Sequence, residues 1–375
     1  MVNIGLVGCG YWGKKYLRVL GDLSEGRLTA VCDADPVLLE KTLAGKPRLL
    51  ATTSYDDLLS SNIDAVVIAT PAVTHFPLAR KALEQGKHVL VEKPFTVTSK
   101  ESVELIRLAA EQQLTLMVGA TFLYSQPVRM LKQLITAGDL GQVLYVHSSR
   151  LNFGLLRPDV DVLWDLAPHD LSILLYLLDS EPVAVGTRGV SCVNPRISEV
   201  AYADLLFGND VYAHLHLSWL EPQKVRRLTV VGSERMVIYD DLAGNEAIRL
   251  YDRRVSPVYE NGNGNGHASS NGRSNGNGAA PMQQFNYHLG DVRLPYVKDA
   301  EPLHEEVSHF VYSIRNGARP LSDGLHGLQV VRILEALTRS LEQGGAMECL
   351  TPTKDDGREP LMVSVNILPE VAIEH

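Results

Sequence analysis

The chain has 375 residues, 45% of them hydrophobic and 21% charged, which is the composition of a globular protein long enough for two domains. Its net charge of -9 argues against a nucleic-acid-binding surface, and no apolar run reaches membrane-spanning length. The N-terminus leads into an apolar strand pattern rather than a signal peptide. Four cysteines at positions 9, 32, 192 and 349 lack metal-binding spacing, so we expect buried free thiols, a cytoplasmic protein and no bound metal.

The first element is an apolar strand, a glycine-rich turn and an amphipathic helix, together Val2–Leu20. The turn places Gly8, Gly10 and Gly13 in the pattern G-x-G-x-x-G. Gly8 permits a sharp turn, Gly10 lets the backbone approach a pyrophosphate, and Gly13 lets the helix pack tightly on its strand. The helix N-terminus then offers N–H groups to phosphates. The alternative is a tight strand–helix turn that binds nothing.

An acid closes the next predicted strand, Leu28–Cys32. Asp33 stands where a carboxylate would bond the adenosine ribose hydroxyls of a dinucleotide. No basic residue follows until Lys41, so a 2′-phosphate would meet uncompensated negative charge. This favours NAD over NADP. The alternative is that Asp33 caps the helix expected to start near Pro36.

Strand and helix patterns keep alternating to about Gly119. The predicted strands are Asp64–Thr70, Lys87–Val91 and Leu114–Val118, and the predicted helices are His75–Gln85 and Ser99–Gln112. Such repeats predict a parallel sheet with helices on both faces, a Rossmann domain over residues 1–120. Ligands bind at the carboxyl ends of such strands, where Thr70-Pro71 and Glu92-Lys93-Pro94 lie.

Residues 121–375 follow a different pattern and predict an α+β domain with a large open mixed or antiparallel sheet. The predicted strands are Val143–Arg150, Val183–Val193, Glu199–Phe207, Val211–Trp219, Arg227–Gly232 and Met236–Tyr239. The predicted helices are Gln126–Thr136, Asp165–Leu178, Leu303–Asn316 and Gly324–Gln343, the last two closing this domain. Gly208 and Asn209 are expected to form a hairpin turn. His214 and His216 share one side of a strand and are expected on the sheet surface or in an interface.

The segment 260–281 consists almost entirely of Asn, Gly and Ser. It has too little apolar surface to offset the entropy of ordering, so we expect a disordered surface loop. The alternative is an interaction tether.

Two patterns are suited to chemistry. Lys93 ends a parallel strand, where an ammonium group can stabilise negative charge on a substrate oxygen, although it could equally be a solvated strand end. Asp165 and His169 lie four residues apart on one helix face, so the carboxylate would orient the imidazole and raise its basicity for proton abstraction. A helix start near Asp165 would put Pro168 in the first turn, where proline is tolerated. The alternative is an N-cap and a surface histidine.

Taken together, these motifs resemble the Gfo/Idh/MocA oxidoreductase family, over nearly the whole chain. VGCGYWG, Asp33, the Ala69–Pro71 turn, the Glu92–Pro94 turn and D-x-x-x-H at Asp165–His169 occur in the family's order. The resemblance implies a catalytic Lys93, a base at His169, its partner Asp165, and a homodimer or homotetramer through the open sheet. The expected cofactor-binding residues are Gly8, Gly10, Tyr11, Trp12, Gly13, Asp33, Thr70, Pro71, His75 and Glu92.

Within the family the chain is similar to the branch of UDP-N-acetylglucosaminuronate 3-dehydrogenases. That likeness implies a sugar or sugar-nucleotide substrate whose ring hydroxyl is oxidised, with Arg150, Asn152 and Arg157 as candidate substrate contacts. These three could equally be ordinary strand-edge and loop residues. The rival functions are a dehydrogenase of a free sugar or cyclitol, a non-catalytic NAD-binding regulator, and a glycosidase that works through transient oxidation.

Overall fold

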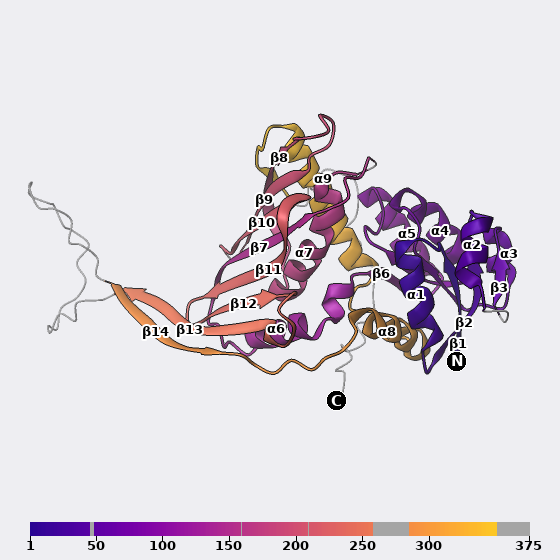
Figure 1. Ribbon diagram of the computed structural model, residues 1–375, viewed down its shortest axis with the longest axis horizontal. Helices are drawn as coiled ribbons and strands as arrows, with labels where there is room; N and C mark the ends of the chain where they lie inside the picture. Colours follow the sequence, from indigo (N-terminus) through magenta and orange to yellow (C-terminus); the bar gives the residue numbers. More distant parts are fainter. Residues whose placement is uncertain (46–48, 159, 209, 258–284, 351–375) are drawn as a thin grey trace, which may run out of the picture.

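The computed structural model describes residues 1–45, 49–158, 160–208, 210–257 and 285–350 (Figure 1). The first domain is a six-stranded parallel sheet with strand order β3-β2-β1-β4-β5-β6. Its strands are β1 (Val2–Val7), β2 (Gly26–Cys32), β3 (Leu50–Thr52), β4 (Ala65–Ile68), β5 (His88–Glu92) and β6 (Leu116–Gly119). The strand order reverses beside β1, which is where a Rossmann sheet binds its dinucleotide.

Helices cover both faces of this sheet, as the near-continuous apolar strands predict. They are α1 (Tyr11–Gly21), α2 (Pro36–Leu43), α3 (Tyr55–Ser60), α4 (His75–Glu84) and α5 (Ser99–Glu111). All four residues of β4 are buried. The predicted Rossmann fold is therefore confirmed.

The second domain is built on a nine-stranded sheet with order β14-β13-β12-β11-β7-β10-β9-β8-β15. Its strands are β7 (Val143–Phe153), β8 (Pro182–Val190), β9 (Val200–Phe207), β10 (Tyr212–Ser218), β11 (Leu220–Gly232), β12 (Met236–Asp240), β13 (Ile248–Pro257), β14 (Phe285–Arg293) and β15 (Glu348–Cys349). Only the pairing of β10 with β7 is parallel within the described sheet. The predicted mixed, mostly antiparallel sheet is confirmed.

One face of this sheet is covered and the other is open. Helices α6 (Gln126–Thr136), α7 (Val162–Leu178) and α9 (Gly324–Glu342) pack on the covered face. The open face presents Tyr145, Tyr202 and Tyr212, each at least 40% exposed. His214 also lies on this face, stacked between His147 and Tyr202, as the sheet-surface prediction had it. At one edge, β13 and β14 form a two-stranded ribbon that extends away from the body (Figure 1).

Helix α8 (Pro302–Asn316) departs from the expected domain assignment. The sequence pattern places it in the second domain, but it packs against α1 and β1 of the first and against the adjoining 3₁₀ turn η2 (Thr121–Tyr124). Its buried side chains include Leu303, Val307 and Phe310, which join the apolar cluster of the Rossmann sheet. The first domain is thus completed by residues nearly two hundred positions after its last strand.

Two local expectations need correction, and two others concern residues that the structure does not describe. Helix α7 starts at Val162 and not near Asp165, because the side chain of Asp161 accepts the Trp164 N–H and caps it; Pro168 therefore lies inside the helix. Cys192 and Cys349 are exposed rather than buried, although all four cysteines are free. Asn209 of the expected hairpin turn and the whole segment 260–281 lie outside the described residues.

Candidate functional site

The glycine turn has the geometry that a dinucleotide requires. Gly8 has φ +95°, and a Cβ there would lie 2.5 Å from the carbonyl oxygen of Ala69. A Cβ on Gly13 would lie 1.9 Å from the Gly8 oxygen, whereas one on Gly10 would meet open space. No side chain caps the N-terminus of α1, so its N–H groups remain available to phosphates.

Asp33 is held against this turn. Its Oδ2 accepts the backbone N–H of Cys9 at 2.6 Å, and its Oδ1 accepts that of Asp35 at 2.9 Å. The alternative role as a helix cap is wrong, because the Asp35 side chain caps α2 through the N–H groups of Val37 and Leu38. The carboxylate of Asp33 therefore stands beside the glycine turn, where the ribose of a dinucleotide would lie.

His75 connects the two turns at the carboxyl edge of the sheet. The side chain is 1% exposed, with Nδ1 2.8 Å from the Pro94 carbonyl oxygen and Nε2 2.9 Å from that of Thr70. Burial lowers the pKa of His75. The ring is thus engaged with the backbone on both sides, and it shapes the expected cofactor site. The Thr70 hydroxyl is bonded to that of Thr74 in the same turn.

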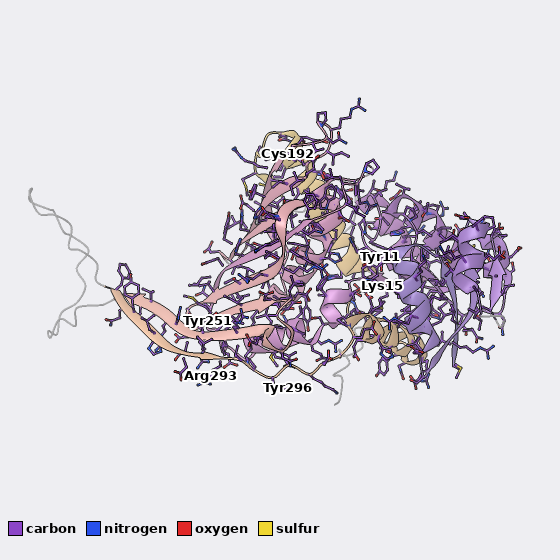
Figure 2. All side chains as sticks on the ribbon, viewed as in Figure 1. Tyr11, Lys15, Cys192, Tyr251, Arg293 and Tyr296 are labelled. Carbon is purple, nitrogen blue, oxygen red and sulfur yellow. The ribbon has the colours of Figure 1, made fainter. Side chains whose placement is uncertain are left out.

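Tyr11, Trp12 and Lys15 occupy the exposed start of α1. The Lys15 ammonium lies 4.4 Å from the centroid of the Tyr11 ring and 4.3 Å from that of Trp12. Tyr11 is 75% exposed. Figure 2 shows Tyr11 and Lys15 at the boundary between the two domains. Both aromatic rings therefore lie next to the glycine turn, at the start of α1.

Lys93 reaches from the first domain to the second. Its Nζ donates to the backbone oxygen of Asp165 at 2.8 Å and lies 3.8 Å from the Asp165 carboxylate. The Lys93 side chain is 16% exposed. Burial lowers the pKa of Lys93, and the charges of Asp165 and Glu92 oppose that shift. Lys93 is therefore a partly desolvated cation inside the interdomain site, which excludes the reading as a solvated strand end.

Asp165 lies beside Lys93 rather than serving His169 as expected. Its Oδ2 accepts the indole N–H of Trp219 at 3.2 Å, and its Oδ1 lies 3.4 Å from Arg157. Among the described residues, no hydrogen bond joins Asp165 to His169. Helical spacing places Asp165 and His169 on one face. Asp165 nevertheless pairs with Lys93 from the other domain instead of with His169.

His169 has a cationic and aromatic environment. Its ring packs edge-on against Phe122 with centroids 5.1 Å apart. Burial lowers the pKa of His169 well below its usual value, and the charges of Lys93, Arg150 and Arg226 lower it further. The expectation that a neighbouring carboxylate raises the basicity of His169 is therefore wrong for this structure. A lowered pKa favours the neutral imidazole, which is the form that can accept a proton.

The three candidate substrate contacts have different surroundings. Arg150 is 6% exposed and forms a bidentate ion pair with Asp170, at 2.7 and 3.1 Å. The amide oxygen of Asn152 is buried without a hydrogen-bond partner among the described residues. Arg157 is 43% exposed and pairs with Asp165. Of the two arginines, Arg157 is the more accessible to a substrate.

Lys93 and His169 line the same small pocket. Phe122 separates His169 from the strand arginines, since the Arg150 and Arg226 guanidinium groups lie 4.6 and 5.9 Å from its ring centroid. Sequence reasoning missed Phe122, Trp219 and Arg226, because only the fold brings them to this site. No group of His, Cys, Asp and Glu suited to a metal occurs among the described residues. None of the described helices is long and apolar enough to cross a membrane.

Comparisons with known proteins identify the family of both domains. The family of oxidoreductases with an NAD-binding Rossmann fold matches residues 2–120, and the GFO/IDH/MocA C-terminal domain matches residues 128–238. UDP-N-acetylglucosamine 3-dehydrogenase of Acidithiobacillus ferrooxidans is 32% identical over 258 residues, which is 68% of this chain and 79% of the relative.

Two further likenesses extend over more of the chain. A crystal structure of that same dehydrogenase superimposes with TM-score 0.73 at 26% identity, covering 92% of this chain and 98% of the other. Inositol 2-dehydrogenase of Rhizobium meliloti is 23% identical over 91% of this chain and 97% of its own length. The fold and site define an oxidoreductase with an NAD-binding Rossmann domain and a second, open-sheet domain. The chain belongs to the Gfo/Idh/MocA family.

Proposed function

We propose that the chain oxidises a ring hydroxyl of a nucleotide-linked sugar, with NAD as the hydride acceptor. The observation that carries the proposal is the convergence of Lys93 from the first domain and His169 from α7 on one cavity. Oxidation of an alcohol needs a base for the hydroxyl proton and a positive charge near the oxygen, which a neutral imidazole and an ammonium group can supply. When bound, NAD supplies the hydride chemistry.

The glycine turn suits binding of the cofactor, and three other residues have separate roles in the reaction. The open approach at Gly10 and the free N-terminus of α1 suit a pyrophosphate. His169 takes the hydroxyl proton, and the Lys93 ammonium stabilises negative charge on the same oxygen. Asp165 holds Lys93 through its backbone oxygen and carboxylate.

The substrate proposal rests on relatives and on charge. The name of the Acidithiobacillus ferrooxidans relative supports a UDP-linked sugar, and that of the Rhizobium meliloti relative supports a cyclitol as the alternative. Arg157 remains the candidate for an anionic substrate group, such as the carboxylate of a UDP-hexuronate. Arg150 supports this substrate less, because it is buried in its ion pair with Asp170, whereas the Arg157 side chain is 43% exposed.

A substrate screen tests the proposal directly. NADH formation is measured with UDP-N-acetylglucosamine, UDP-N-acetylglucosaminuronate, free N-acetylglucosamine and myo-inositol. We expect kcat/KM to be at least tenfold higher for a UDP-linked sugar than for the free sugars, and Lys93→Ala to lower kcat by roughly 10²-fold. Preference for myo-inositol would contradict the substrate class. NAD binding without turnover of any substrate would favour the non-catalytic regulator.

Asp33 carries the proposed preference for NAD. The carboxylate beside the glycine turn would repel a 2′-phosphate, so NAD should bind at least ~10-fold tighter than NADP, about 1.4 kcal/mol. Fluorescence titration of both cofactors measures the ratio. Asp33→Ser combined with Ala34→Arg should reduce the ratio of NAD affinity to NADP affinity. Equal affinities in the unaltered protein would contradict the preference for NAD.

The open sheet face is the proposed site of self-association into a dimer or tetramer. Its exposed tyrosines and the stacked His147 and His214 form a broad, partly apolar surface without a covering element among the described residues. Light scattering should give a mass of two or four chains. Tyr202→Arg in the middle of this face should shift the mass towards one chain, whereas a monomeric unaltered protein would overturn the proposal.

A further inference from the structure

Two carboxyl groups are buried together behind the Lys93 turn. Glu92 at the end of β5 is 5% exposed, and Glu306 in the middle of α8 is fully buried. The hydroxyl of Tyr16 from α1 donates to Glu92, and burial together with the nearby Glu306 carboxyl group raises the pKa of Tyr16. Three separate parts of the chain therefore meet at one buried acidic pair, which the mechanism above does not use.

The surroundings of the two carboxyl groups differ, and those of Glu92 stabilise a negative charge better than those of Glu306. Its Oε1 accepts the Tyr16 hydroxyl at 2.9 Å, and its Oε2 accepts the backbone N–H of Lys93 at 3.1 Å. Burial raises the pKa of Glu92, while the Tyr16 hydrogen bond and the charges of Lys93 and Lys15 oppose the shift. Glu92 is therefore the better site for a negative charge.

Glu306 has little to stabilise a charge. Its Oε2 accepts the Thr121 hydroxyl at 2.9 Å, but its Oε1 has no hydrogen-bond partner among the described residues. Burial raises the pKa of Glu306 well above its usual value, the charge of Glu92 raises it further, and Thr121 and Tyr16 lower it by less. The nearby Tyr124 is itself kept neutral by burial. Two buried carboxylates so placed cannot both ionise.

We propose that Glu306 is a positioning residue: held as a neutral carboxylic acid beside Tyr16, it leaves Glu92 as the ionised acceptor for the Lys93 backbone N–H. In this arrangement Glu306 on α8 helps to fix the conformation of the Glu92-Lys93 turn, and this turn positions the Lys93 ammonium in the active site. The protonation assignment rests on the full burial of Glu306, its unpartnered Oε1 and the raised direction of its pKa, whereas the link to catalysis rests on the proposed function.

Infrared spectroscopy tests the protonation state of the full-length protein. At neutral pH the unaltered protein should show the carbonyl-stretching band of a buried protonated carboxylic acid, and Glu306→Gln should remove it. Glu305→Gln, on the same helix, is the matched control and should leave the band in place. Absence of the band, or its loss in Glu92→Gln but not in Glu306→Gln, would overturn the assignment.

Unfolding gives a second test that needs no substrate. An acid whose pKa is raised in the folded state makes the protein less stable as pH rises from the unfolded pKa, about 4.3, towards the folded one. The unfolding constant of the unaltered protein relative to Glu306→Gln should therefore rise with pH, by up to about tenfold per pH unit. A ratio independent of pH between 5 and 8 would contradict a neutral Glu306. Glu305→Gln should show no such trend.

Catalysis tests the positioning role. Glu306→Ala should lower kcat about tenfold or more while the KM for NAD changes little, because the turn behind Lys93 loses its support. Glu306→Gln, which keeps the shape of the neutral acid, should restore most of the lost kcat. Full kcat in Glu306→Ala would overturn the positioning role. If no substrate turns over, the infrared and unfolding results still decide the protonation assignment.

Discussion

The pKa of His169 gives the clearest residue-scale prediction. The proposed role of His169 as a base needs a neutral imidazole, and burial with three nearby cations lowers the pKa of His169 below its usual value. The rise of kcat/KM with pH should therefore be complete below about pH 6.5, with activity lost only on further acidification. His169→Asn should remove this acid limb. A pH profile of kcat/KM measures it, with His304→Gln as a control that keeps the limb.

Arg150 supports a different prediction from the one its sequence position suggested. Removing it would leave the Asp170 carboxylate buried and unpaired, so Arg150→Ala should destabilise the protein by roughly 3–5 kcal/mol. Arg150→Met with Asp170→Leu should recover most of that loss. Urea unfolding measures both variants. A stable Arg150→Ala protein that loses activity only on charged substrates would instead favour a direct substrate contact.

At the scale of single elements, α7 depends on its cap. The Asp161 carboxylate accepts the Trp164 N–H at 2.9 Å at the start of the helix that carries Asp165 and His169. Asp161→Ala should cost about 1 kcal/mol of unfolding free energy, and Asp161→Asn much less, because Asn caps helices equally well. Thermal or urea unfolding distinguishes the two. Equal loss in both variants would mean that the carboxylate charge matters more than the cap.

Elements whose own residues show a strong hydrophobic pattern were predictable from the sequence. Elements whose position depends on contacts with distant parts of the chain were not. The runs at β1 and β4 are apolar on both faces, which signals a buried parallel strand. Strand β14 is exposed along nearly its whole length and gives no such signal, because its only described sheet neighbour is β13. The site follows the same rule: Lys93 and His169 stood out in local motifs, whereas Phe122, Trp219 and Glu306 join them only through tertiary packing.

At the scale of the whole molecule, the first domain depends on α8, a helix from the C-terminal part of the chain. A fragment of residues 1–124 would expose the surface that Leu303, Val307 and Phe310 cover. We expect it to bind a hydrophobic dye and to unfold without a sharp transition. Fusing residues 300–317 to it through a flexible linker should restore cooperative unfolding. A cooperative fragment without α8 would show that the helix is dispensable for this core.

The same packing has a consequence for the order of events at the ribosome. Domains usually fold as they emerge, N-terminal part first. Here the six parallel strands leave the ribosome long before α8, and strands β7 to β14 of the second sheet are synthesised in between. Part of the apolar surface of the first domain therefore stays uncovered while some two hundred further residues are translated. Chaperone occupancy on the nascent chain should accordingly persist until residue 316 has emerged, and not decline after residue 120.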